Sequence, residues 1–301
     1  MTLVIMAAGM GSRYGGLKQI DPITPQGAFI LDFSIYDALL AGFDHVVFVI
    51  KEENYEIFRE TVGRRIEGKI RVSYAFQKLD ALPAPFTVPA GRERPWGTGQ
   101  AVLSAADVVC DNFAVINADD FYGRDAFMRL GEFLRTAKAD EAGVESCCMV
   151  GYALDNTLTE HGTVSRGQCT ANAEGMLTAI VERTKIKRTE TGAAYLDGEQ
   201  WHDLPTNTIV SMNCWGFTTA TMQYMARYFA EFLAEEGGDP LKREFYLPSA
   251  VEGMMRDGIC RVRVLETDAV WQGVTYPEDK PKVVAAIRAM IAEGEYPEKL
   301  W

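Results

Sequence analysis

The chain has 301 residues, with 30 lysines and arginines against 42 aspartates and glutamates, so its formal net charge at pH 7 is −12. A chain of this length buries roughly 75% of the surface that its unfolded form exposes, and it can build a core without disulfides or a structural metal. The 48% apolar and 24% charged residues exclude wholesale disorder. The acidic excess argues against a nucleic-acid-binding protein, which needs a basic surface to displace counterions.

Cysteine and histidine usage indicates a cytoplasmic protein. Six cysteines are scattered along the sequence without a Cys-x-x-Cys pair, and only three histidines are present, so a zinc site is not expected. The N-terminal residues lack the basic segment of a secretory leader, and no apolar run reaches the roughly 18 residues of a membrane span. We expect reduced thiols and no membrane partner.

The first half of the sequence alternates between strand and helix patterns. Four short, mostly apolar runs are typical of strands buried in a parallel sheet; they cover residues 3–7, 45–50, 70–76 and 113–117. Apolar residues at helical spacing lie between them, at residues 29–41, 52–68 and 98–109. Such alternation implies right-handed βαβ units, so we predict an α/β fold with a doubly wound, mostly parallel, Rossmann-like sheet.

The second half is less regular. We predict strands at residues 147–154, 176–183, 210–217 and 259–266, and helices at residues 218–235, 246–256 and 281–293. A Gly-rich excursion separates the first two of these strands, as an inserted hairpin would. A proline-rich stretch, residues 80–95, and a polar stretch, residues 184–204, are predicted to be loops near the functional site.

A glycine-rich loop follows the first predicted strand. Such a strand-to-helix turn lets backbone N–H groups approach phosphate oxygens closely. The dinucleotide-binding fingerprint needs a third glycine where Tyr14 stands, and the Gly-Lys-[Ser/Thr] of the P-loop is absent. Arg13 and Lys18 give the first 20 residues a charge of +2, because no acid precedes Asp21. A positive loop in an acidic chain suits a polyanion, although a solvated surface turn has the same composition.

The loop sequence resembles the signature of the sugar-1-phosphate nucleotidyltransferases (NDP-sugar pyrophosphorylases). The stretch Ala-Ala-Gly-Met-Gly-Ser-Arg, followed by Leu-Lys, is similar to their Ala-Ala-Gly-x-Gly-Thr-Arg and later Pro-Lys. The resemblance implies that the loop backbone wraps a nucleoside triphosphate, through Ala7, Ala8, Gly9, Gly11 and Ser12. It also implies that Arg13 and Lys18 are catalytic residues that contact the phosphates.

Two further segments resemble the family's base-reading residues. They contain Gln77, after the third strand, and Gly97 and Thr98 in the stretch Trp-Gly-Thr-Gly-Gln-Ala. A base edge is read by a side-chain amide together with backbone groups that only glycine lets come close. Gln100 stands where uridylyltransferases carry histidine, so the choice of base stays open. The Gly-Thr-Gly stretch also fits an ordinary loop and helix N-cap.

The end of the fourth strand, Val-Ile-Asn-Ala-Asp-Asp, resembles the family's Val-Leu-x-Gly-Asp, whose aspartate binds Mg²⁺. The resemblance assigns that role to Asp119. An aspartate at the carboxyl edge of a parallel sheet suits Mg²⁺, which takes one or two protein carboxylates plus phosphates and water. Side chains alternate along a strand, so only one of Asp119 and Asp120 is expected to be a ligand. The pair could instead cap the following helix.

Three residues resemble the family's sugar-binding positions. Glu182 lies in Ile-Val-Glu-Arg, which is similar to a Val-Glu-Lys-Pro motif whose glutamate binds sugar hydroxyls. Asn213 and Trp215 lie in a segment similar to Asn-Ala-Gly-Ile-Tyr, which lines the sugar pocket. The ring of Trp215 could stack on a sugar or simply fill the core.

The last motif departs from the family. Its Trp-x-Asp-x-Gly-Thr often supplies a second metal ligand, but Gly273 stands in place of that aspartate. Either Asp268 replaces it, or Asp119 holds a single metal.

These motifs together predict a Mg²⁺-dependent enzyme that joins a nucleoside triphosphate and a sugar-1-phosphate to give an NDP-sugar and pyrophosphate. Positioning and charge neutralisation suffice for such chemistry. Two alternatives stay open, a cytidylyltransferase acting on a non-sugar phosphate such as phosphocholine and a non-catalytic nucleotide- or sugar-nucleotide-sensing module. We expect one domain over residues 1–301, with a nucleotide-binding half (1–120), a sugar-phosphate half (121–280) and a C-terminal helix and tail (281–301). The sequence leaves the oligomeric state open, a homo-oligomer included.

Overall fold

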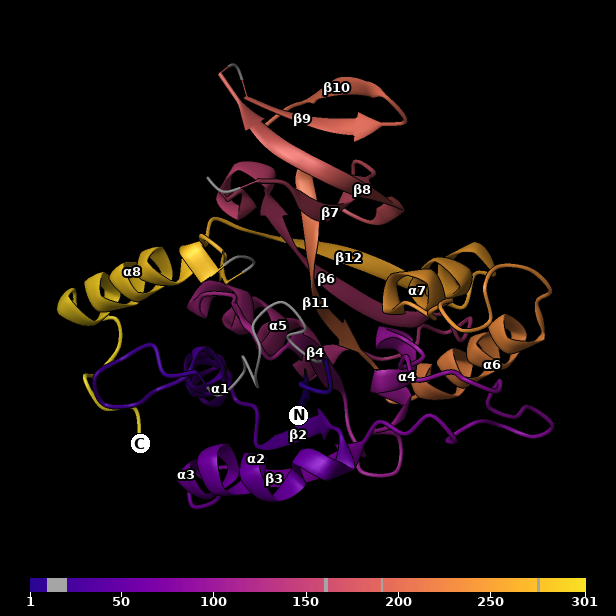
Figure 1. Cartoon of the computed structure of the whole chain (residues 1–301), viewed down its shortest axis with the longest axis horizontal. Helices are drawn as coiled ribbons and strands as arrows, with labels where there is room; N and C mark the ends of the chain where they lie inside the picture. Colours follow the sequence, from indigo (N-terminus) through magenta and orange to yellow (C-terminus); the bar gives the residue numbers. More distant parts are fainter. Residues whose placement is uncertain (10–20, 160–161, 191, 275–276) are drawn as a thin grey trace.

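The computed structural model describes residues 1–9, 21–159, 162–190, 192–274 and 277–301. Within these residues, 11 strands form one mixed sheet, and two short strands, β5 and β13, pair separately (Figure 1). The strands are β1 (Thr2–Met6), β2 (His45–Ile50), β3 (Arg71–Phe76), β4 (Phe113–Asn117), β5 (Asp120–Phe121), β6 (Glu145–Ala153), β7 (Val164–Ala171), β8 (Leu177–Thr189), β9 (Gly192–Asp197), β10 (Gln200–Leu204), β11 (Ile209–Phe217), β12 (Cys260–Thr267) and β13 (Gln272–Gly273).

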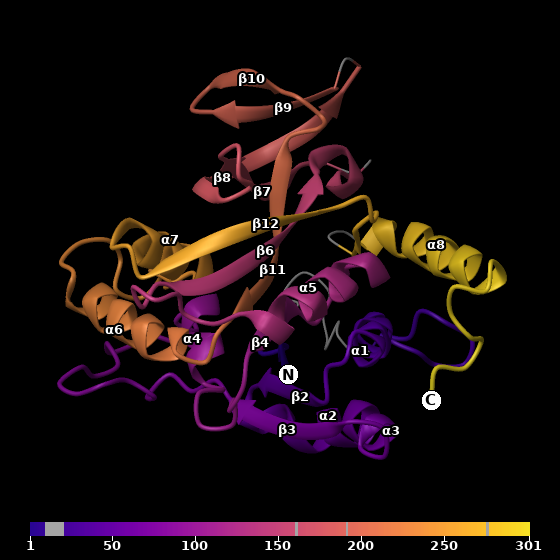
Figure 2. The same ribbon diagram turned by 180° about the vertical axis from the view of Figure 1, so that it is seen from behind.

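Helices cover both faces of the sheet. The α-helices are α1 (Ile30–Leu40), α2 (Tyr55–Phe58), α3 (Arg64–Ile66), α4 (Thr98–Leu103), α5 (Arg124–Thr136), α6 (Thr221–Ala234), α7 (Leu247–Arg256) and α8 (Lys280–Ala292). Three segments are 3-10 helices, η2 (Glu52–Asn54), η4 (Leu154–Thr157) and η5 (Pro277–Asp279), and η3 (Arg59–Gly63) is a π-helical segment between α2 and α3. Figures 1 and 2 show α1, α5 and α8 on one side, and α4, α6 and α7 on the other.

The two faces have separate apolar cores because side chains alternate along each strand. In β1, Leu3 and Ile5 pack with buried residues of α1 and α5, whereas Val4 packs with those of α4, α6 and α7. Strand β1 pairs in parallel with β2 and β4, and β2 pairs in parallel with β3. The predicted doubly wound α/β fold is therefore confirmed. Beyond β4 the sheet continues antiparallel through β11.

The predicted loop at residues 184–204 was wrong. This stretch continues β8 and then forms β9 and β10, an antiparallel extension at the end of the sheet (Figure 1). Most of its side chains are exposed, so its polar composition resembles that of a loop. The buried exceptions are Ile186, Ala193, Ala194 and Leu204. The proline-rich stretch at residues 80–95 does lack helix and strand.

Helix α5, strand β7 and the two-residue strands β5 and β13 were also not predicted from the sequence. Helix α5 buries Phe127, Leu130 and Leu134 at a helical spacing that could have identified it. Strand β7 was read only as part of a Gly-rich excursion, because exposed and buried residues mix along it.

A buried carboxylate ties the C-terminal segment to α1 and α5. Asp37 of α1 is 0% exposed and accepts hydrogen bonds from the Tyr296 hydroxyl and from Arg124 Nε, the latter at 2.9 Å. Burial raises the pKa of Asp37 to about 6, and the bonds from Tyr296 and Arg124 only partly oppose this rise. The folded protein therefore holds a proton on Asp37 more tightly than the unfolded chain does.

We expect Asp37→Asn to flatten the pH dependence of stability in mildly acidic solution. The folded-state pKa of about 6 lies above the ordinary 3.8, so the stabilisation by protonated Asp37 is complete below 3.8 and is lost as the pH rises through 6. The melting temperature of the variant, relative to wild type, should increase as the pH is raised across this range. Thermal unfolding at several pH values measures it, with the exposed Asp107→Asn as control. Parallel pH profiles for Asp37→Asn and wild type would contradict the expectation.

Candidate active site

The carboxyl ends of the four parallel strands β1, β2, β3 and β4 meet at one edge of the sheet. The Ala7 N–H donates to a β2 carbonyl at 2.8 Å, the Ala118 N–H to the last carbonyl of β1 at 3.1 Å, and the Gln77 N–H to the last carbonyl of β2 at 2.9 Å. The structure thus brings the segments of Gly9, Gln77 and Asp119 to neighbouring strand ends. Ala7 and Ala8 are buried beneath this edge. Four predicted phosphate-binding residues, Gly11, Ser12, Arg13 and Lys18, lie outside the described residues.

The two aspartates after β4 have different surroundings. Asp120 is 8% exposed, and its Oδ2 accepts hydrogen bonds from Asn117 Nδ2 at 2.8 Å and from the Tyr122 hydroxyl at 3.3 Å. Asp119 is less buried than Asp120. This difference agrees with the alternation of side chains expected at a strand end.

Asn213 is directed at the end of β4 by a bulge in β11. At this bulge, residues 212–214 of β11 face Val150 alone on β6, and Asn213 has a left-handed backbone with φ 61°. Its Nδ2 donates to Asn117 Oδ1 at 2.9 Å, and its Oδ1 accepts from Trp215 Nε1 at 3.1 Å. Bulges beside active sites commonly redirect a side chain in this way, and asparagine tolerates the backbone conformation better than most residues.

Trp215 lies in the core. It is 0% exposed and stacks on Phe217, with ring centroids 6.2 Å apart and planes inclined by 16°. Its indole therefore orients Asn213 and has no open face on which a sugar could stack. Of the two roles considered from the sequence, stacking on a sugar and filling the core, the structure shows the second.

Glu182 and Arg166 come from the paired strands β8 and β7. Glu182 as a whole residue is exposed. Partial loss of water around its carboxyl nevertheless raises the pKa of that group, and the positive charge of Arg166 opposes the rise. Arg166 is 8% exposed and donates hydrogen bonds to the hydroxyl and carbonyl of Thr157 and to the carbonyl of Ser165. Burial lowers the pKa of Arg166 to about 10, and the charges of Asp120 and Glu182 oppose this.

The sequence reading missed Arg166. Arg166 stands between Ser165 and Gly167, so its surroundings in the sequence gave no sign that it is buried; its 8% exposure is set by the tertiary structure.

Gly273, and not Asp268, lies beside Asp120. Strands β5 and β13 pair Gly273 with Asp120, whereas Asp268 is exposed and its carbonyl accepts a hydrogen bond from Asn156 at 3.4 Å. A Cβ atom at Gly273 would lie 2.2 Å from the Trp271 ring. The indole therefore occupies the space in which a side chain at position 273 would begin.

The Gly-Thr-Gly stretch has structural roles of its own. Gly97 has φ 103°, and a Cβ atom there would lie 2.5 Å from the carbonyl oxygen of Phe245. The Thr98 hydroxyl accepts a hydrogen bond from the Leu247 N–H at 2.9 Å and so caps the start of α7. Thr98, predicted to contact the base, thus caps a different helix from the one it begins.

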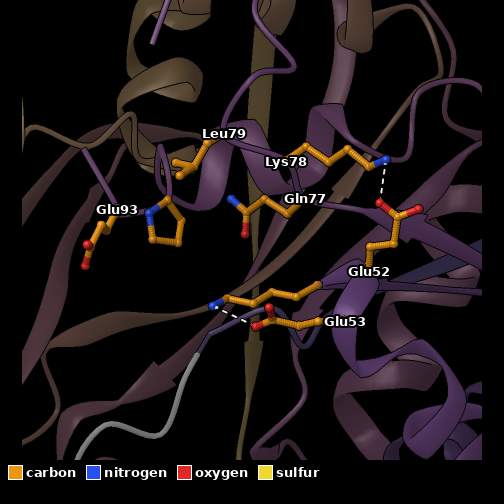
Figure 3. Close-up of a pocket in the computed structure, with 8 residues that line it drawn as sticks. Glu52, Glu53, Gln77, Lys78, Leu79 and Glu93 are labelled. Atoms are coloured by element: carbon orange, nitrogen blue, oxygen red, sulfur yellow. Dashed lines mark hydrogen bonds and ion pairs between the residues drawn. The ribbon is translucent and has the colours of Figure 1, made fainter. Parts of the chain in front are cut away.

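A cavity of about 210 Å³ lies beside Gln77, at the ends of β2 and β3 (Figure 3). Its lining includes Lys51, Glu52, Lys78 and Leu79. Gln77 is the predicted base-reading residue, so the cavity lies where the sequence expects the nucleobase.

Comparison with known proteins decides the family. Residues 2–258 match the family described as Nucleotidyl transferase. The chain belongs to the nucleotidyltransferase family. A search of curated proteins found no match.

Solved structures show the same fold at low sequence identity. The inositol-1-phosphate CTP transferase from T. maritima is 13% identical, with a TM-score of 0.61 and 96% of each chain covered. A Bacillus anthracis protein assigned as a glucose-1-phosphate thymidylyltransferase is 14% identical, with a TM-score of 0.63, covering 96% of this chain and 95% of that one. HddC from Yersinia pseudotuberculosis is 14% identical, with a TM-score of 0.56, covering 95% of this chain and 99% of that one.

This nucleotidyltransferase has no helix, within the residues described, that is both long and apolar enough to span a bilayer. Its six cysteines are all free, and five of them are buried.

We expect Gly273→Ala to lower the free energy of unfolding by about 1–3 kcal/mol, because the added methyl group must displace the Trp271 ring. In a Trp271→Leu background the same substitution should cost much less, and urea denaturation of the four proteins measures the coupling. Gly68→Ala is the matched control, since a Cβ atom there meets nothing within 4 Å. Equal costs of Gly273→Ala in both backgrounds would contradict the assigned contact.

Proposed function

We propose that this nucleotidyltransferase transfers a nucleotidyl group from a nucleoside triphosphate to a sugar-1-phosphate, in a reaction that depends on Mg²⁺. An acceptor phosphate oxygen attacks the α-phosphorus in line, the bond from the α-phosphorus to its bridging oxygen breaks, and pyrophosphate leaves with that oxygen. No protein nucleophile is required, since the protein acts by positioning and by neutralising charge.

The hydrogen bond between Asn213 and Asn117 carries this proposal. It joins β11, on which the sugar-binding residue is predicted, to the end of β4, two residues before the predicted metal ligand Asp119. An acceptor held at Asn213 and Glu182 would then lie beside a nucleotide held at the ends of β1 and β3. Transfer between two phosphates needs this proximity.

Asp119 suits a magnesium site built with substrate phosphates. Among the described residues, no group of three or more histidine, cysteine, aspartate or glutamate side chains is arranged to hold a metal ion. Mg²⁺ needs only one or two protein carboxylates when phosphates and water complete its shell. Because a glycine, Gly273, lies beside Asp120, we favour a magnesium site with Asp119 as its single protein carboxylate. Bound Mg²⁺ would offset the negative charge of the transferring and leaving phosphates.

The remaining roles follow from the sequence resemblance and from the geometry. Arg13 and Lys18 bind the triphosphate, Gln77 and the Gly97 backbone seat the base, and Glu182 accepts hydrogen bonds from sugar hydroxyls. Arg166 balances the charges of Asp120 and Glu182 from within the protein. Trp215 holds the orientation of Asn213.

Pyrophosphate release tests the reaction and identifies both substrates. The panel crosses the common nucleoside triphosphates with several sugar-1-phosphates, and adds inositol-1-phosphate and phosphocholine as non-sugar acceptors. Release that depends on one nucleotide and one sugar-1-phosphate supports the proposal. Pyrophosphate release only with a non-sugar acceptor would show that the acceptor is not a sugar-1-phosphate. Nucleotide binding without any pyrophosphate release would favour a sensing module.

We expect Asp119→Asn to lower kcat by at least about a hundredfold while leaving the fold intact, because the carboxylate that would hold the metal is lost. Asp197→Asn, at an exposed aspartate of β9, is the matched control and should retain full turnover. Pyrophosphate release and thermal unfolding are measured for both proteins. Turnover of Asp119→Asn at the wild-type rate would remove Asp119 from the mechanism.

A further inference from the structure

Gln77 and Gln100 form a hydrogen-bonded pair whose amides are oriented by main-chain carbonyls. Gln100 Nε2 donates to the Lys78 carbonyl at 3.1 Å, which turns Gln100 Oε1 toward Gln77. That oxygen accepts a hydrogen bond from Gln77 Nε2 at 2.8 Å, and the same nitrogen also donates to the Gly97 carbonyl at 3.1 Å. A primary amide has two N–H donors, so both donors of Gln77 are used within the protein.

The carbonyl oxygen of Gln77 is the group that remains for a ligand. Within the described part of the chain, no group donates a hydrogen bond to Gln77 Oε1. Figure 3 shows the Gln77 amide in the middle of the residues that line the cavity. Reversing this amide would set its oxygen against two other oxygens, Gly97 O and Gln100 Oε1. The orientation is therefore fixed by repulsion as well as by hydrogen bonds.

Gln100 is well placed to fix this orientation because it is itself immobilised. It is 2% exposed and lies in α4, which packs against α6 and α7. The neighbouring Trp96 donates its indole N–H to the Leu79 carbonyl at 2.9 Å, so two residues of one motif hold the segment that follows Gln77.

The charges around the cavity suit an uncharged group. Lys51 pairs with Glu53 at 3.4 Å, and Lys78 pairs with Glu52 at 2.7 Å. Glu93 adds a further carboxylate to the lining, so two lysines face three glutamates. This lining would repel a phosphate, whereas it accepts a neutral ring that offers N–H groups.

We propose that Gln100 sets the base specificity of this enzyme by holding Gln77 with its carbonyl oxygen toward the base. The preferred base then carries a ring N–H at its hydrogen-bonding edge, as uracil, thymine and guanine do. Cytosine and adenine have a lone pair on the corresponding ring nitrogen, which would face the lone pairs of Gln77 Oε1. The inference rests on the proposed function, since it assigns the cavity to the base of the nucleotide.

Equilibrium binding of nucleotides to the intact protein with Mg²⁺ tests the donor requirement by calorimetry. We expect at least one of UTP, dTTP and GTP to bind about tenfold or more tightly than CTP and ATP. N3-methyl-UTP or N1-methyl-GTP, in which a methyl group replaces the ring proton, should lose that advantage. Tightest binding of CTP or ATP, undiminished binding of the methylated analogue, or no binding of any nucleotide would each overturn the inference.

Variants of Gln100 test its part in the preference. Gln100→Leu removes the acceptor for Gln77 and should reduce the ratio of affinities between the preferred nucleotide and CTP or ATP by about tenfold. Gln100→His should preserve the ratio, because a neutral imidazole has one donor and one acceptor. Ser104→Ala, on the same helix, removes a hydroxyl bonded to the Gln100 carbonyl and should leave the ratio unchanged. An unchanged ratio in a folded Gln100→Leu protein would overturn the role of Gln100.

Binding and turnover separate this inference from the proposed function. Pyrophosphate release with CTP as the best substrate would support nucleotidyl transfer and overturn the inference about the base. Tight binding that requires the ring N–H, without pyrophosphate release on any acceptor, would support the inference and contradict the proposed reaction.

Discussion

A change of partner along β11 determines the geometry of the candidate site. The first part of β11 pairs with β7 and its last part with β4, and the bulge at residues 212–214 lies between the two. Backbone groups at such a transition cannot all enter a regular ladder, so side chains bond across it. The hydrogen bonds from Trp215 to Asn213, from Asn213 to Asn117 and from Asn117 to Asp120 fulfil this role. They also bring polar groups of both halves of the sheet to the end of β4.

Charge near this junction is arranged differently from the family pattern that the sequence resembles. The position of the second carboxylate is taken by Gly273, and the Trp271 ring fills the space above it. The Arg166 guanidinium lies 4.8 Å from the centroid of that ring. A buried cation is stabilised by nearby negative charge, and here Asp120 and Glu182 supply it. Gly273 therefore lies near a buried cation, Arg166, that none of the sequence motifs contains.

The sequence predicted the fold correctly for the strands that are buried on both faces. The runs at residues 45–50 and 113–117 coincide with β2 and β4, because a strand buried on both faces is mostly apolar. The strand predicted at residues 176–183 coincides with the first part of β8, but prediction failed for the rest of β8 and for β9 and β10, where most side chains are exposed and few are apolar. The family could also be predicted, since glycine-rich loops and strand-end carboxylates keep a local spacing.

Local sequence thus determined the strands of the parallel core and the identity of the residues at the strand ends. Only the tertiary structure decided what those residues contact. Trp215 and Asn213 are two positions apart, but a bulge makes one a core residue that orients the other. Gln77 and Gln100 are separated by 23 positions, and their amides acquire a direction only when β3 and α4 are packed together. Hydrogen-bond direction depends on which donors and acceptors face each other across elements, and residue spacing along the chain does not encode that.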